Sequence, residues 1–444
     1  MAKASRSVMS SSSAPRSGAR LQPRVCVIGA GPCGLTALKN LLAAGQSDVV
    51  CYDESDAIGG NWVFREEGDR TSVYFSTHII SSKRLSEFED YPMPADYPDF
   101  PSHRQLRAYF DSYAAHFALG PFIRLRTRVE RAQLGSDGRW SVSLSGGGQE
   151  IFDHLIVCSG HHREPYVPEH AGEFTGEVLH SRDFKRGERF RDRRVLVIGG
   201  GNSACDIAVD ISRVAARTCI SFRRGYYIVP KLLFGRPIDL LYAKARKLPR
   251  AMVQPLLGAL LRLGIGPWEK YGLARPECGP LEMHPTLNSD ILNALRHGRV
   301  LPRPALEWFE GGIVHFRDHI AEPFDVVLWA TGFRISFPFL DSSIVDWDTS
   351  GPPPLYLKMM HPRIDNLFFI GLFQPIGCIW RLADHQARIA ALQIAGRLPR
   401  PADIAARIRS ETPHWQFQKT PRHSIEVDYH DFRRDLMGAM SRAH

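Results

Sequence analysis

The segment Val25 to Asp53 constrains the fold of this chain more than any other. A run of small and β-branched apolar residues leads into Gly29, Gly31 and Gly34, and apolar residues at helical spacing follow. The first glycine permits a tight turn, the second lets backbone N–H groups approach a pyrophosphate, and the third allows close helix–strand packing. Asp53 ends the next expected strand, where a carboxylate can accept hydrogen bonds from a ribose. The segment therefore predicts a strand, loop, helix and strand that bind a dinucleotide.

A second copy of this unit begins at Val195, at a constant offset of 170 residues. It places Gly199, Gly201, Ala204 and Arg223 where the first copy has Gly29, Gly31, Gly34 and Asp53. Arg223 and Arg224 can bind a 2′-phosphate, which an acid at the same place would repel. A solvated strand end is the alternative interpretation of this arginine pair. We expect NADPH at the second site and FAD at the first, with electron transfer between them.

Composition indicates a soluble globular protein. The chain has 444 residues, 44% of them hydrophobic and 23% charged, which is enough for two or three domains with cores of their own. No apolar run approaches the length of a membrane span. Eight cysteines without a CxxC pair suit buried thiols in a reducing compartment, so we expect a cytoplasmic protein without a metal site.

The net charge of +9 is unevenly distributed. Residues 223–275 carry eleven basic and two acidic residues, but they lack interleaved aromatic platforms, so no nucleic-acid partner is expected. We interpret the basic and apolar insertion 225–275 as a helical roof folded over the protein; contact with an anionic membrane surface or a cover for a substrate channel are the alternatives. The serine- and arginine-rich tail, 1–22, is expected to be disordered, and its acid-free composition also suits a transit peptide.

These patterns predict an α/β fold with two Rossmann-like dinucleotide-binding domains, the NADPH domain inserted into a discontinuous FAD domain. The expected boundaries are 23–168 for the first part of the FAD domain, 169–320 for the NADPH domain, and 321–444 for the second part with the C-terminal tail. A helix is expected near 103–117, and strands near 122–129 and 139–143. DHLIVCSG (153–160) and FDVVLWATGF (324–333) each predict a buried strand that runs into a glycine turn.

Three further motifs make the chain resemble the flavin-containing monooxygenases from about residue 23 to 400. They are GGNW at 59–62, FTGEVLHSRDF at 174–184 and ATGF at 330–333, in that family's order and spacing. The second matches the family signature through Phe174, Gly176, His180 and Phe184. The related Baeyer–Villiger monooxygenases usually have tryptophan where Phe184 stands, so the chain looks like the branch that oxidises nitrogen and sulfur.

The resemblance implies a cycle in which NADPH reduces FAD and reduced flavin reacts with O2 at its C4a carbon. The resulting C4a-hydroperoxyflavin then passes one oxygen atom to an amine or sulfide. The apolar insertion suggests a small, fairly lipophilic substrate, and the resemblance suggests a homodimer. The expected FAD contacts are Gly29, Gly31, Pro32, Gly34, Asp53, Gly60, Asn61, Trp62, Val129 and Gln374; the expected NADPH contacts are Gly199, Gly201, Asn202, Ser203, Ala204, Arg223 and Arg224.

The chain departs from the family at two places. Ile80 stands where the family usually has an asparagine that steadies the oxygenated flavin or NADP+, and isoleucine cannot donate a hydrogen bond. That task would pass to His78, Ser81 or Ser82, although a solvated histidine and two turn serines are an equally good interpretation. Leu372 stands where many related flavoproteins have an aspartate near the ribityl chain, which leaves Gln374 as the expected polar contact.

Other functions remain as alternatives. Baeyer–Villiger oxidation of ketones needs the same cofactors, and the protonation state of the peroxide decides between the two outcomes. A pyridine-nucleotide disulfide reductase would need a closely spaced cysteine pair, which this chain lacks. The substitution at Ile80 also allows an uncoupled NADPH oxidase or a non-catalytic flavoprotein that binds NADPH.

Overall fold

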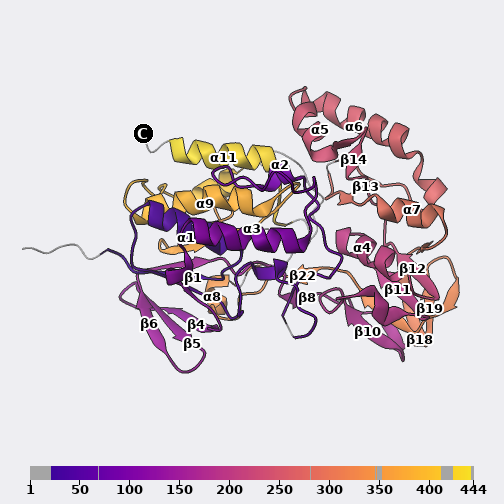
Figure 1. Cartoon of the computed structure of the whole chain (residues 1–444), viewed down its shortest axis with the longest axis horizontal. Coiled ribbons are helices and arrows are strands. Elements are labelled where there is room, and N and C mark those ends of the chain that lie inside the picture. Colours follow the sequence, from indigo (N-terminus) through magenta and orange to yellow (C-terminus); the bar gives the residue numbers. More distant parts are fainter. Residues whose placement is uncertain are drawn as a thin grey trace, which may run out of the picture.

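A computed structural model describes residues 22–441 except 69, 281, 346, 348–352 and 412–423. The expected disordered tail therefore lies almost wholly outside the described residues. The described chain forms two parallel five-stranded sheets with helices packed against them, as the two nucleotide-binding patterns predict (Figure 1). All ten strands of these sheets run parallel to their neighbours.

The first sheet has the strand order β23-β7-β1-β2-β3. Its strands are β1 (Val25–Ile28), β2 (Val49–Tyr52), β3 (Ile123–Arg124), β7 (His154–Val157) and β23 (Leu367–Phe369). Alternate residues of β1 face opposite sides, so Val25 and Val27 pack under helices α1 (Pro32–Ala43), α3 (His103–His116) and α9 (Ile379–Ile394). Cys26 and Ile28 pack against the antiparallel strands β4 (Val129–Leu134), β5 (Trp140–Leu144) and β6 (Gln149–Phe152). Helix α11 (Tyr429–Ser441) lies on α9.

The second sheet has the order β10-β21-β11-β12-β17. Its strands are β10 (Glu177–His180), β11 (Arg194–Ile198), β12 (Arg217–Ser221), β17 (Leu301–Arg303) and β21 (Val326–Trp329). Helices α4 (Asn202–Ile211) and α7 (Asp290–Arg296) cover one face. A small sheet of β9 (Ala171–Phe174), β18 (Leu306–Gly311), β19 (Ile313–Phe316) and β20 (Ala321–Pro323) covers the other.

Two expected boundaries differ from the structure. The NADPH unit does not end at 320, because β21 pairs with both β10 and β11 of the second sheet. The chain returns only after β22 (Phe333–Arg334), which pairs with the outgoing linker strand β8 (Glu164–Pro165). The strand expected over 122–129 is interrupted, because Arg126 adopts a left-handed φ of 55° between β3 and β4.

The insertion 225–275 includes a hairpin and two helices, and the helices stand beside the end of α11 (Figure 1). The hairpin is β14 (Leu232–Leu233) with β15 (Arg236–Pro237), and the helices are α5 (Ile238–Ala245) and α6 (Arg250–Ile265). Tyr242 of α5 donates a hydrogen bond to Asp428 at 2.7 Å, and Arg246 pairs with Asp431 of α11. These contacts agree with the helical roof that the sequence favours. No helix among the described residues is long and apolar enough to cross a membrane.

The remaining elements connect these units. They are η1 (Gly60–Trp62), α2 (Lys83–Ser86), η2 (Gly120–Phe122), η3 (Gly187–Phe190), β13 (Ile228–Val229), η4 (Trp268–Tyr271), β16 (Thr286–Leu287), α8 (Ser342–Val345), β24 (Gln374–Pro375), α10 (Ile404–Ser410) and β25 (Glu426–Val427).

Candidate functional site

The first glycine loop forms a cradle at the N-terminus of α1. A Cβ atom on Gly34 would lie 1.8 Å from the carbonyl oxygen of Gly29, and one on Gly29 would lie 2.8 Å from that of Cys158. The nearest atom to a Cβ on Gly31 is the Cα of Gly60, at 3.6 Å. Gly29 and Gly34 are therefore required by packing, whereas a Cβ on Gly31 would make only ordinary van der Waals contact with Gly60. Pro32 begins α1, whose first-turn N–H groups lack partners within the helix and suit an anion.

The GGNW segment closes one side of this cradle. The Gly59 N–H donates to the Ala30 carbonyl at 2.9 Å, and Gly60 adopts a φ of 57° where the two loops meet. Asn61 is exposed, and Trp62 is partly buried with its ring edge-on to Trp380 at 5.6 Å. The segment thus combines the glycine turn with a partly open tryptophan face, as expected of a wall beside a ring system.

Asp53 lies directly after β2 and holds the glycine loop in place. Its two carboxylate oxygens accept hydrogen bonds from the N–H groups of Ala30 at 2.6 Å and Ser55 at 2.7 Å. Burial nevertheless raises the pKa of this carboxyl above its ordinary value. Each oxygen keeps a further lone pair for a ribose hydroxyl. Val129 is buried at the start of β4, two residues after Thr127, whose N–H donates to the Asp53 carbonyl.

The second glycine loop repeats this geometry at the N-terminus of α4. A Cβ on Gly199 would lie 2.4 Å from the carbonyl oxygen of Ala330 and 3.4 Å from the Cβ of Ala204. Ala204, which stands where the first copy has Gly34, is fully buried, so this loop accommodates a methyl group there. Gly201 is the N-cap of α4, and the exposed Ser203 lies in its first turn. The side-chain oxygen of Asn202, an expected NADPH contact, already accepts a hydrogen bond from the Leu287 N–H at 2.7 Å.

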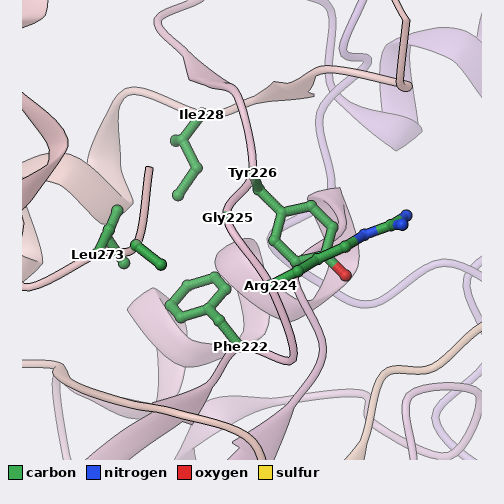
Figure 2. A pocket seen from close by; sticks show the side chains of 7 residues that line it. Phe222, Arg224, Gly225, Tyr226, Ile228 and Leu273 are labelled. Atoms are coloured by element: carbon green, nitrogen blue, oxygen red, sulfur yellow. The ribbon is translucent and has the colours of Figure 1, made fainter. Parts of the chain in front are cut away.

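Arg223 and Arg224 follow the carboxyl end of β12. Arg223 is exposed, and the Arg224 guanidinium lies 5.7 Å from the centre of the Tyr226 ring (Figure 2). Neither has a carboxylate partner among the described residues, whereas the nearby Arg217 and Arg303 both pair with Glu322. The Nε atom of Arg224 is buried without a hydrogen-bond partner. An unneutralised arginine pair at this strand end suits a phosphate better than a merely solvated role.

The cavity beside Arg224 in Figure 2 is not a ligand site. Its volume is about 10 Å³, which holds no more than one water molecule. Its lining is largely apolar, from Phe222, Ile228 and Leu273.

The Ile80 loop is held between the two units and the insertion. The N–H of Ser82 donates to Asp239 of α5 at 2.6 Å. The Ser81 hydroxyl is hydrogen-bonded to that of Ser86 at 2.9 Å, and Ile80 is partly buried. His78 lines a separate polar cavity of about 210 Å³ together with Ser76, Phe100, Asp206, Val209, Asp210, Arg213, Lys231 and Asp290. Neither Ile80 nor Ser81 lines that cavity, so these three candidate residues do not share one.

Two histidines near Gln374 were missed at the level of sequence. His161 follows the glycine turn after β7 and is only 8% exposed. His284 is hydrogen-bonded to Glu426 at 3.0 Å, and Glu426 lies opposite Gln374 in the pairing of β24 with β25. The dipeptide HH directly after a strand and glycine turn was an available signal for His161. No local sequence pattern predicts a role for His284, because its hydrogen-bond partner Glu426 is 142 residues away.

His180 of the FTGEVLHSRDF motif joins that motif to ATGF. Its Nδ1 accepts the Arg182 N–H at 3.1 Å, so Nε2 carries the proton and donates to the Gly332 carbonyl at 3.0 Å. Its ring also lies edge-on to Phe333, with centroids 5.1 Å apart. The motif histidine therefore fixes the linker through which the chain leaves the second sheet.

We expect His180→Phe to lower the free energy of unfolding by about 1–2 kcal/mol, because the partly buried Gly332 carbonyl and Arg182 N–H both lose their partner. His180→Gln retains a donor near Nε2 and should recover part of this loss. Urea denaturation measures both effects, with the exposed His297→Phe as control. Equal stability of the His180→Phe and control variants would contradict this account.

Comparison with known proteins agrees with this geometry. Residues 22–442 match the family model described as flavin-binding monooxygenase-like. The chain is 34% identical over 432 residues to flavin-containing monooxygenase 5 of Oryctolagus cuniculus, covering 91% of this chain and 80% of that protein. It is 33% identical over 440 residues to dimethylaniline monooxygenase [N-oxide-forming] 2 of Rattus norvegicus, with 93% and 82% covered.

Solved structures share the fold at low identity. The S-allyl-L-cysteine S-oxygenase from Allium sativum has a TM-score of 0.71 at 21% identity, covering 95% of this chain and 89% of its own. A cyclohexanone monooxygenase also has a TM-score of 0.71, at 15% identity, with 95% and 98% covered. The two open cradles and the unpaired arginines fit FAD and NADPH, the cofactors of the matching family. The chain is a FAD- and NADPH-dependent oxidoreductase that belongs to the flavin-containing monooxygenase family.

Proposed function

We propose that the protein uses NADPH and O2 to transfer one oxygen atom to the nitrogen of an amine or the sulfur of a sulfide, in a small and fairly lipophilic substrate. Bound FAD supplies the hydride acceptor and the centre that reacts with O2. The chain's own task is to hold the two cofactors and to exclude water. The N-termini of α1 and α4 would hold the pyrophosphates, Asp53 a ribose and Arg223 a 2′-phosphate.

The observation that carries this choice of substrate class is the packing of Phe184. Its ring is 1% exposed and lies 5.5 Å from the Tyr74 ring and 5.8 Å from the Phe190 ring. The Tyr74 hydroxyl donates to Asp206 of α4, so this cluster joins the flavin-binding part of the chain to the NADPH unit. A tryptophan, typical of ketone-oxidising relatives, would overfill this site. The N-oxide-forming relative supports the same choice.

The test supplies NADPH under air to the FAD-loaded protein with N,N-dimethylaniline, methyl phenyl sulfide or cyclohexanone, each in a separate reaction. We expect N-oxide and sulfoxide in proportion to the NADPH consumed, and no lactone. Lactone as the main product would establish Baeyer–Villiger oxidation instead. Hydrogen peroxide equal to all NADPH consumed, with every probe, would overturn the monooxygenase assignment for these substrate classes.

Ile80 favours one second function, an NADPH oxidase that releases hydrogen peroxide. The Ser81 hydroxyl is paired with Ser86 and the Ser82 N–H with Asp239, so neither of these groups replaces the missing amide. The Ser82 hydroxyl, which is buried without a hydrogen-bond partner, is the group left for that task. We expect Ile80→Asn to lower the fraction of NADPH lost as peroxide by at least about twofold, because the amide adds a donor and an acceptor. Peroxide and NADPH measured together check this, with Ile80→Leu as control. An unchanged peroxide fraction in Ile80→Asn would show that position 80 does not control coupling.

We further propose that the outer face of this helical roof, which points away from the contacts with Asp428 and Asp431, rests on an anionic membrane surface. Met252, Leu256 and Leu263 form one exposed stripe of α6, and Leu263 is 81% exposed. Phe234, at the tip of the β14–β15 hairpin, is 69% exposed. The exposed Lys244, Lys247 and Arg262 complement anionic lipid headgroups.

We expect the protein to float with phosphatidylcholine vesicles that contain 30 mol% phosphatidylserine, and to bind pure phosphatidylcholine vesicles at least about fivefold less. The double variant Phe234→Asn, Leu263→Gln should lose most of this binding, because asparagine tolerates the positive φ of residue 234 and both changes remove apolar surface. Val178→Ser, a change at an exposed residue of the second sheet, is the matched control. Absence of the unaltered protein from the floated vesicles would refute the proposal.

A further inference from the structure

His161 is a buried polar side chain without a hydrogen-bond partner. Only 8% of the residue is exposed, and neither Nδ1 nor Nε2 has a partner within hydrogen-bond geometry. Burial, and after it the neighbouring His162, lowers the pKa of His161 to about 3, and the nearby Gln374 side chain opposes this shift. The imidazole is therefore neutral at physiological pH and offers one donor and one acceptor. Buried groups of this kind are rarely left unpaired, because the lost hydrogen bonds with water go uncompensated.

The strand order places His161 on the flavin side of the first cradle. Asp53 follows β2, the glycine loop follows β1, His161 follows β7 and Gln374 follows β23. These strands are parallel neighbours in the order β23-β7-β1-β2, so all four groups lie at the same edge of the sheet. A dinucleotide with its ribose at Asp53 and its pyrophosphate at α1 extends its other half across β7 and β23. That other half of FAD carries the ribityl chain and the flavin.

Few polar side chains lie around His161, where the ribityl chain and flavin of FAD would extend. Leu372, which follows β23, is 4% exposed and apolar, and Phe373 is fully buried. Gln374 is the polar side chain that follows them, and its influence on the pKa of His161 places the two side chains together. The His161 ring is also braced, because it lies edge-on to His162 at 4.3 Å and His162 lies 5.1 Å from Phe333. The imidazole is thus held in place before any cofactor binds.

We propose that His161 is a positioning residue for FAD, whose neutral imidazole exchanges hydrogen bonds with the ribityl hydroxyl groups beside Gln374. Hydroxyl groups match the site because they donate and accept, as the imidazole does. The inference rests on FAD binding by this family and not on the choice of amine, sulfide or ketone as substrate.

The experiment compares His161→Phe with the unaltered protein in two titrations. Apoprotein is titrated with FAD, and bound flavin is followed by its fluorescence and its visible spectrum. We expect the Kd for FAD to rise about tenfold, because a buried hydrogen bond of this kind is worth about 1.4 kcal/mol. ADP, which lacks the flavin half, is measured in competition, and its Kd should stay within about twofold. His161→Gln, which restores a donor and an acceptor, should recover part of the affinity for FAD.

Stability of the apoprotein separates this role from a structural one. Since the His161 nitrogens have no protein partner, His161→Phe should unfold at the same or a higher urea concentration than the unaltered apoprotein. His162→Phe is the matched control. Residue 162 is exposed, and a phenylalanine there retains the ring contact with His161, so the Kd for FAD should be unchanged. An unchanged Kd in His161→Phe, or an equal rise for FAD and ADP, would overturn the proposal. These titrations contain no NADPH, O2 or substrate, so a protein that produces only peroxide would still give the expected result.

Discussion

Gly34→Ala is expected to give a protein without bound flavin and with markedly lower stability. The added Cβ would lie 1.8 Å from the carbonyl oxygen of Gly29 and 2.9 Å from its carbonyl carbon, and both are backbone atoms that cannot rotate away. Helix α1 must therefore move off β1, although its neighbours Leu35 and Leu38 are fully buried in the core. We expect a loss of about 3 kcal/mol or more in the free energy of unfolding. Urea denaturation and the ratio of bound flavin to protein measure the two effects.

Two matched variants separate packing from cofactor binding. Gly31→Ala places its Cβ 3.6 Å from the nearest atom, the Cα of Gly60, so the protein should fold normally. It should bind FAD at least about tenfold more weakly, because any side chain at this glycine hinders the close approach of a pyrophosphate to the loop backbone. Ala204→Gly, at the corresponding position of the second unit, should leave FAD binding unchanged. A Gly34→Ala protein that retains one flavin per chain would show that α1 can shift without cost, and the packing account would be wrong.

The glycine positions were predictable because their demands are local. A turn, a helix start and a close approach all occur within ten residues, so the sequence from Gly29 to Gly34 contains the information that the geometry uses. The repeat at an offset of 170 residues carries the same information to Gly199 and Gly201. The second copy differs at this position, where Ala204 is fully buried and its methyl group is accommodated against the second loop.

Sheet membership could not be predicted in the same way. DHLIVCSG and FDVVLWATGF have one pattern, an acid, a buried strand and a glycine turn, yet β7 pairs in the first sheet and β21 in the second. The two acids also make the same kind of contact. Asp153 accepts a hydrogen bond from the N–H of Arg24, just before β1, and Asp325 accepts one from the N–H of Arg194, at the start of β11. A pattern read along the chain gives the type of an element but not its partner.

Site residues that depend on distant partners were missed or left open for the same reason. His161 lies beside Gln374, which is 213 residues away in the sequence. The Ile80 loop is held by a hydrogen bond from Ser82 to Asp239 of the insertion. The sequence analysis grouped Gly60, Asn61 and Trp62 with the first glycine loop as expected FAD contacts, and in the structure the Gly59 N–H donates to the Ala30 carbonyl of that loop. The sequence could not show that Ser81 is already paired with Ser86, because two nearby serines predict a turn and not a particular hydrogen bond.

Arg223→Ala is expected to raise the KM for NADPH at least about tenfold and to leave the KM for NADH within about twofold. The two coenzymes differ only in the 2′-phosphate, and Arg223 is an exposed guanidinium at the strand end where that group would lie. A charge-assisted hydrogen bond contributes about 1.5–3 kcal/mol when its partner is a phosphate. Adding Arg224→Ala should widen the gap further, since the buried Nε of Arg224 lacks a partner. Initial rates of flavin reduction with each coenzyme measure the effect.

Arg299→Ala is the matched control for this prediction. Arg299 is also exposed and lies just before β17, a parallel neighbour of β12, so it stands at the opposite edge of the same sheet. Loss of its charge changes the net charge of the protein by the same amount but should leave both KM values unchanged. Equal increases for NADPH and NADH in Arg223→Ala would mean that the arginine binds a group common to both coenzymes, such as the pyrophosphate. The coenzyme preference would then have to come from elsewhere in the second unit, and the exchange of an acid for an arginine between the two copies would have another cause.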